Sequence, residues 1–317
     1  MSSKIPTRTI LMLLPALMVV CGCNSISHKQ QRKLIDARRH SGMGFQKIHN
    51  GSWEDAEKLF QIALEKSEND ERAHWGLAES YWNRGKTDMA VEHMEQAVRL
   101  SAGDPKMVQR LGRMYLDIGR LDKAATHSSW ALESERDSAD AWALHGDCLH
   151  AAAIESNAGH EGLQPALAAY HRALALQPDY PKVQQTAAEI YLKQQRYDRV
   201  LATLDRLHDT HGVDTSPARV DVLRGIALKQ EGRTDDAKTS FERAIAKDGN
   251  DPDPLIELAM FELQQGRLQQ ARSHLERARQ IAPAGIENSF VDSKLREAEQ
   301  KVAANPARQD GISNPKR

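Results

Sequence analysis

Cysteine, aromatic residues and net charge are all scarce in this sequence. The three cysteines stand at positions 21, 23 and 148, aromatic residues make up 5% of the chain, and the formal net charge is −1. Because basic and acidic residues balance, the composition gives no reason to expect a nucleic-acid partner. The low aromatic content suits a fold whose contacts are made by alanine, leucine and other small apolar residues.

Patterns that would carry catalysis or hold a cofactor are also missing. Arg84–Thr87 reads like the end of a phosphate-binding loop, but Ser80 stands where that motif requires glycine. His145, Cys148 and His150 lie within two helical turns and need a fourth ligand from elsewhere to close a zinc shell. Cys148 is better explained as a small buried apolar residue. We therefore expect neither an enzyme nor a nucleotide, metal or other cofactor site.

Small residues recur about every 34 residues along most of the chain. The first series is Ala56, Ala90, Ala124, Ala166, Val200, Ala237 and Ala271. A second series precedes it: Gly44, Ala78, Gly112, Gly146, Ala188, Gly225 and Ala259. Such spacing predicts antiparallel helix pairs that cross where the small residues meet, with a bulky residue such as Phe60 or Tyr170 filling the space beside the crossing.

A glycine precedes most members of the first series by five residues, and it allows the chain to reverse between the two helices. These glycines are Gly51, Gly85, Gly119, Gly232 and Gly266, whereas the fifth copy has Gln195. The fourth and fifth copies carry extra residues within 154–164 and 211–217. We expect the first helix of the fourth copy to overrun there, with surface loops at both places.

The pattern His74, Leu77, Ala78, Tyr81, Gly85, Ala90 and Ala97 resembles the tetratricopeptide repeat (TPR) family. The resemblance implies an all-α, right-handed solenoid of about seven helix–turn–helix repeats. The repeats are predicted at 37–70, 71–104, 105–138, 139–180, 181–217, 218–251 and 252–285. A capping helix at 286–304 and a disordered tail at 305–317 are predicted to follow.

The first residues have the layout of a secretory signal. Lys4 and Arg8 precede the apolar run Ile10–Val20, which is too short to span a bilayer. Val20–Cys23 resembles the lipobox of bacterial lipoproteins, which implies a signal peptide at 1–22 and acyl chains on Cys23. The alternative is a plain cleaved signal with an incidental cysteine. Residues 23–36 are expected to form a basic, membrane-proximal linker or lead helix, either against anionic headgroups or simply solvated.

By analogy with the family, the first helix of each repeat lines a concave groove that binds a protein or peptide segment. The groove residues expected in the first three repeats are Arg38, Phe45, Ile48, Arg72, Trp75, Glu79, Trp82, Lys106, Gln109 and Arg113. Trp75 and Trp82 share one helix face, and tryptophan and arginine are the residue types that anchor interfaces. Alternatively, one tryptophan packs between repeats. Glu79 and Arg113 replace the asparagines that the family uses to bind a terminal carboxylate.

The sequence therefore favours a non-enzymatic scaffold anchored by lipid, facing the periplasm from the outer membrane of a bacterium. Its layout is similar to pilus-assembly lipoproteins of the TadD and PilF type, which implies help in assembling a pilus or secretion system. Two alternatives stay open. One is an adaptor for peptidoglycan enzymes, as in TPR lipoproteins of the NlpI type. The other is a self-associating structural protein in which Lys316 and Arg317 of a neighbour reach Glu79.

Overall fold

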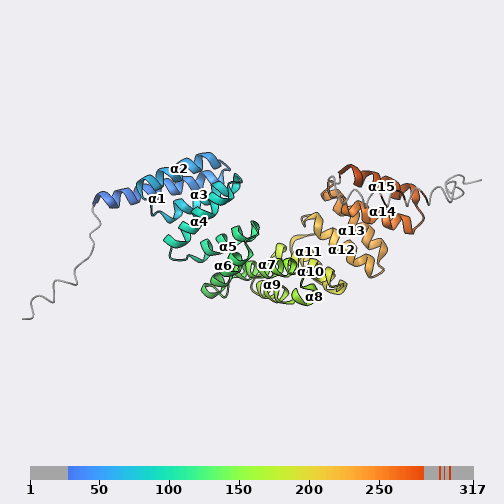
Figure 1. Ribbon diagram of the computed structural model, residues 1–317. Helices are drawn as coiled ribbons and strands as arrows, with labels where there is room; N and C mark the ends of the chain where they lie inside the picture. The colour runs from blue at the N-terminus through green and yellow to red at the C-terminus, as the bar shows by residue number, and fades with distance from the viewer. Residues whose placement is uncertain (1–27, 282–292, 294–295, 297–299, 301–317) are drawn as a thin grey trace, which may run out of the picture. The chain divides into compact units, whose positions relative to one another are not determined.

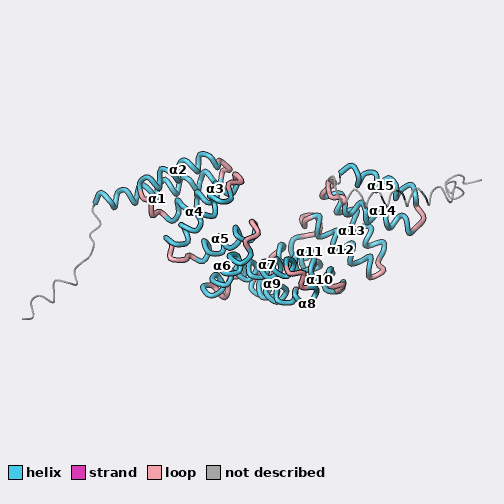
Figure 2. The backbone as a smooth tube through the Cα atoms, in the orientation of Figure 1, coloured by secondary structure: helices cyan, strands magenta, loops and turns pink. Residues whose placement is uncertain are grey.

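The computed structural model describes residues 28–281 together with positions 293, 296 and 300. The described part is all-α and contains fifteen helices and no strand, as predicted (Figures 1 and 2). The predicted signal peptide, Cys23, the capping helix and the tail lie outside the described residues or almost entirely so. The helices are α1 His28–His49, α2 Trp53–Lys66, α3 Glu71–Asn83, α4 Thr87–Leu100, α5 Pro105–Asp117, α6 Leu121–Ser134, α7 Ala139–Glu155, α8 Gly159–Gly162, α9 Gln164–Leu176, α10 Pro181–Lys193, α11 Tyr197–His211, α12 Ala218–Gln230, α13 Thr234–Lys247, α14 Asp253–Gln264 and α15 Leu268–Ile281.

Two main helices fall in the span of each predicted repeat, in sequence order, and we call the first of them A and the second B. The A helices are α1, α3, α5, α7, α10, α12 and α14, and the B helices are α2, α4, α6, α9, α11, α13 and α15. The basic residues after 28 continue into the first A helix, because α1 runs unbroken from His28 to His49. In the fourth repeat α7 overruns as expected, and the predicted loop contains the short helix α8.

The chain divides into two compact units, one ending at Ile118 and the other beginning at Gly119. Unit 1 holds α1 to α5, and unit 2 holds α6 to α15. In unit 1, α1 packs against both α2 and α3. Asp70, which is 2% exposed, accepts hydrogen bonds from Ala73 N at 2.9 Å and from Ser41 Oγ at 3.1 Å. This carboxylate therefore caps α3 and ties its start to α1, which fixes the two A helices side by side.

The helix crossings have the predicted geometry. A Cβ atom built on Gly44, Gly146 or Gly225 would lie 2.6, 2.7 or 2.5 Å from a ring carbon of Phe60, Tyr170 or Phe241, respectively. Phe60 also covers Gly76 of the next repeat, where an added Cβ would come within 2.1 Å of the ring. The aromatic ring therefore occupies the volume that a side chain on the A helix would need.

The turns between paired helices require a left-handed backbone. Gly51, Gly85, Gly119, Gly232 and Gly266 have φ between 72° and 75°. Gln195 takes the same place in the fifth repeat and is forced to φ 57°. A side chain with a Cβ is strained in this region, so the turn geometry is maintained at this position by the packing of α10 against α11.

Replacing Gly44 by alanine should lower the free energy of unfolding by about 1–3 kcal/mol, because the new methyl group overlaps the Phe60 ring. The matched control is Gly42→Ala in the same helix, where nothing lies within 4 Å of an added Cβ. That change should be neutral or stabilising by up to about 1 kcal/mol, since alanine favours helix more than glycine does. Urea denaturation measures both. Equal effects of the two variants would show that Phe60 does not exclude a side chain at Gly44.

Gln195→Gly should raise the free energy of unfolding by about 1 kcal/mol, because glycine adopts positive φ without a Cβ clash. Glu231→Gly provides the control, since Glu231 is the C-cap of α12 with φ −77° and gains nothing from glycine. Thermal or urea denaturation compares the two. Destabilisation by Gln195→Gly, to the same extent as by Glu231→Gly, would contradict backbone strain at this turn.

Candidate protein-binding surface

The groove residues predicted from the sequence all lie on the A helices of unit 1. Arg38, Phe45 and Ile48 belong to α1, Lys106, Gln109 and Arg113 to α5, and the others to α3. The structure brings Phe45, Arg72, Trp75, Glu79 and Trp82 into one connected cluster, which we call the aromatic face. Arg38 is exposed on α1, and Gln109 and Arg113 are half-buried on α5.

Phe45 is the centre of the aromatic face. Its ring meets Phe60 edge to face at a centroid distance of 5.1 Å and Trp75 at 5.7 Å. The Arg72 guanidinium carbon lies 5.7 Å from the centre of the Phe45 ring. Trp75 therefore packs between the first two repeats and also stays half-buried at the surface. The two roles that the sequence left as alternatives, an interface anchor and packing between repeats, are therefore compatible for Trp75.

Glu79 connects the two tryptophans through a hydrogen bond from Trp75 and an ion pair with Arg110, which lies over the Trp82 ring. Arg110 on α5 holds its carboxylate with two bonds of 2.7 Å, from Nε to Oε1 and from Nη2 to Oε2. Trp75 Nε1 donates to the same Oε1 at 3.1 Å, and the Arg110 guanidinium carbon lies 5.5 Å from the Trp82 ring centre. A bidentate pair fixes both partners in orientation. The charged groups thus hold the two indole rings in place.

Arg72 places a positive charge against the Phe45 ring. Within the described part of the chain its side chain takes part in no ion pair, and neither do the side chains of Arg38 on α1 and Lys106 on α5. Glu79 is already neutralised by Arg110. The surface therefore offers large apolar contacts beside uncompensated cations, an arrangement that suits a partner with apolar and acidic side chains.

The comparisons with known proteins agree with this architecture. Models of the tetratricopeptide repeat match residues 48–105, 163–218 and 228–287, which is more than half of the chain. The chain belongs to the tetratricopeptide repeat family. No protein with a curated description matches the sequence.

Several solved structures share this TPR fold. PilF of Pseudomonas aeruginosa is 16% identical, with a TM-score of 0.62 over 72% of this chain and 99% of PilF. A TPR protein of Parabacteroides merdae is 13% identical, with a TM-score of 0.59 over 83% of this chain and 99% of its own. The C-terminal part of a TPR protein of Cytophaga hutchinsonii is 14% identical, with a TM-score of 0.55 over 79% and 98% of the two chains. At these identities the likeness concerns the fold.

TPR proteins bind peptide or protein partners. The residues that we expected to line the groove of this chain lie on A helices. Sequence reasoning nevertheless missed Arg110, because the family's groove positions place Gln109 and Arg113 there instead. A weak signal was present. Glu79 and Arg110 have opposite charges and are 31 residues apart, slightly less than one repeat, which places them on adjacent A helices.

The rejected metal and nucleotide sites have structural roles within the TPR hairpins. Gly85 is the turn glycine before α4, so Arg84–Thr87 joins two helices and follows no strand. Cys148 is buried, and His145 Nδ1 lies 3.2 Å from Ser128 Oγ. Burial lowers the pKa of His145. No cluster of three metal-binding side chains occurs in the described part of the chain.

None of the described helices combines the length and hydrophobicity of a bilayer-spanning segment.

Proposed function

We propose that this TPR protein is a lipid-anchored, non-enzymatic scaffold whose aromatic face binds a segment of another envelope protein. The observation that carries the proposal is the cluster of Phe45, Trp75 and Trp82, which Arg110 holds in place and Arg72, without an ion pair to any described residue, borders. Aromatic side chains with restricted rotamers lose little entropy on binding, so such a cluster is suited to act as the centre of an interface. The partner segment carries apolar residues with acidic neighbours.

We further propose that the scaffold assists assembly of an envelope complex such as a pilus or secretion system. The signal-like segment and the lipobox resemblance at Val20–Cys23 support a lipid anchor, and asparagine rather than aspartate at position 24 favours the outer membrane by resemblance to enterobacterial lipoproteins. The resemblance of its sequence layout to pilus-assembly lipoproteins motivates this role, and the fold that the chain shares with PilF is compatible with it. The self-association alternative, with Lys316 and Arg317 at Glu79, receives less support, because Arg110 and Trp75 already bond to this carboxylate.

Trp75→Ala should weaken binding of the natural partner by at least 2 kcal/mol, or roughly 30-fold, because it removes the ring that links α1 and α3 at the surface. The partner is first identified by affinity capture of the lipidated protein from its own membranes, and the affinity is then measured with purified components. Trp130→Ala is the matched control, since Trp130 is 39% exposed on the B helix α6. Circular dichroism verifies that both variants fold.

The proposal for the aromatic face fails if Trp75→Ala and Trp130→Ala leave the partner affinity equally unchanged. Arg72→Glu adds a test of charge. This charge reversal should strongly lower the affinity for an acidic partner and should lower the affinity for a basic partner little or not at all.

Cys23→Ala should release the protein from membranes, because no acyl chains would then be attached. Cys21→Ala is the control, and this variant should remain in the membrane fraction, since the lipobox places the lipid on Cys23. Fractionation and metabolic labelling with palmitate measure the two variants. A Cys23→Ala protein that keeps its label and its membrane association would rule out this anchor.

A further inference from the structure

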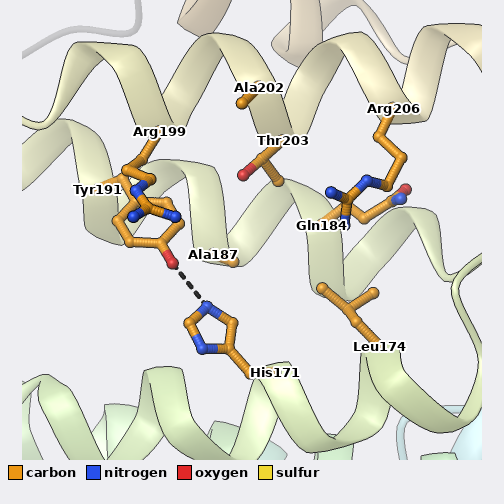
Figure 3. Close-up of a pocket in the computed structure, with 9 residues that line it drawn as sticks. All are labelled: His171, Leu174, Gln184, Ala187, Tyr191, Arg199, Ala202, Thr203 and Arg206. Carbon is orange, nitrogen blue, oxygen red and sulfur yellow. Dashed lines mark hydrogen bonds between the residues drawn. The ribbon is translucent and has the colours of Figure 1, made fainter.

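A small crevice opens between two successive B helices of unit 2. Its walls are α9 and α11, its floor is α10, and its volume is about 120 Å³ (Figure 3). Sites that hold drug-sized molecules measure roughly 300–1,000 Å³. This crevice can therefore admit one side chain or small ion, and it is too small for a nucleotide or an organic cofactor.

Two arginines stand over the crevice. Arg199 and Arg206 are seven residues apart on α11, with Thr203 between them, so all three share one helix face (Figure 3). Arg206 forms no ion pair with any described residue. The nearest carboxylate to Arg199 is on its chain neighbour Asp198, at 3.9 Å from Nε, and it does not line the crevice. The positive charge here is largely uncompensated.

Opposite the arginines, the polar groups are neutral. His171 Nε2 lies 2.6 Å from the hydroxyl oxygen of Tyr191. Burial lowers the pKa of His171, and the positive charges of Arg199 and Arg196 lower it further. The imidazole is therefore neutral at neutral pH, and it hydrogen-bonds to the phenol without adding charge. The arginines supply the cationic character of the site.

The crevice also contains an acceptor without a donor. Gln184 is 1% exposed, and its Nε2 donates to the carbonyl oxygen of Pro178 at 3.0 Å. No described residue donates a hydrogen bond to its Oε1. Buried acceptors are normally satisfied, so this amide oxygen lacks a bond that an occupant of the crevice could supply.

We propose that this crevice binds the carboxylate of an aspartate or glutamate side chain in a peptide segment of a partner protein. The planar guanidinium groups of Arg206 and Arg199 match a carboxylate in bidentate geometry. A backbone N–H beside that side chain supplies the donor for Gln184 Oε1. A phosphodiester group or an isolated ionised carboxylate has no such donor, so a peptide carboxylate with its neighbouring backbone N–H satisfies the site better than either anion alone. The site lies on B helices of unit 2 and is independent of the aromatic face.

The test uses the full chain and three probes: the capped peptides acetyl-Ala-Glu-Ala-amide and acetyl-Ala-Gln-Ala-amide, and inorganic phosphate. Titrations are followed by NMR on the Thr203 backbone amide and the Gln184 side-chain amide. The glutamate peptide should bind saturably and at least tenfold more tightly than the glutamine peptide or phosphate. Its affinity should fall as ionic strength rises, because salt screens the arginine–carboxylate attraction.

Arg206→Gln should weaken the glutamate peptide at least tenfold, with Arg199→Gln as a second variant at the other end of the crevice. Arg172→Gln is the matched control, since Arg172 is on α9, pairs with Asp137 at 4.0 Å and does not line the crevice. It should leave the affinity unchanged within twofold. Absence of saturable binding, equal affinity for phosphate or the glutamine peptide, or equal effects of Arg206→Gln and Arg172→Gln would overturn the proposal. None of these results depends on Trp75, so failure of this proposal does not bear on the proposed function of the aromatic face.

Discussion

The contact on which each unit depends is the crossing of two paired helices, where a large side chain of the B helix lies on a small residue of the A helix. Phe60 on Gly44 and Phe241 on Gly225 leave no room for even one additional carbon. The small residues Ala56, Ala63, Ala237 and Ala244 on the B helices are almost completely buried beside these rings. Close packing of this kind sets the distance between paired helices. It leaves the outward faces of the A and B helices available for other contacts.

Because this contact is local and repeated, the sequence alone predicts the fold. The crossings need small residues, the reversals need positive φ, and both requirements recur at fixed offsets in the chain. Gln195 shows how strong the requirement is, since a non-glycine residue adopts φ 57° where the pattern demands a left-handed turn. The same pattern predicts where each repeat begins and ends. It does not predict the short helix α8, because an insertion carries no copy elsewhere in the chain with which it could be compared.

The binding surfaces are less predictable, because they depend on contacts between different repeats. The family's groove positions place Phe45, Trp75 and Glu79 on adjacent A helices. They omit Arg110, whose guanidinium on α5 bonds to Glu79 on the neighbouring A helix α3. Nothing in the sequence pattern predicted the crevice of unit 2. It exists because small side chains at Ala187 and Ala202 leave space between α9 and α11, and such a gap is visible only once the register of three helices is known.

Arg110 and Arg206 show how the same residue type acquires different roles in one chain. Arg110 is paired with Glu79, and its planar guanidinium lies over the Trp82 ring. It therefore fixes the orientation of side chains in the aromatic face and adds little net charge to it. Arg206 forms no ion pair with any described residue, so its charge stays available to a ligand. A formal net charge of −1 for the chain conceals this difference. The charge that each unit can offer to a partner therefore depends on which of its charged side chains are paired inside the fold.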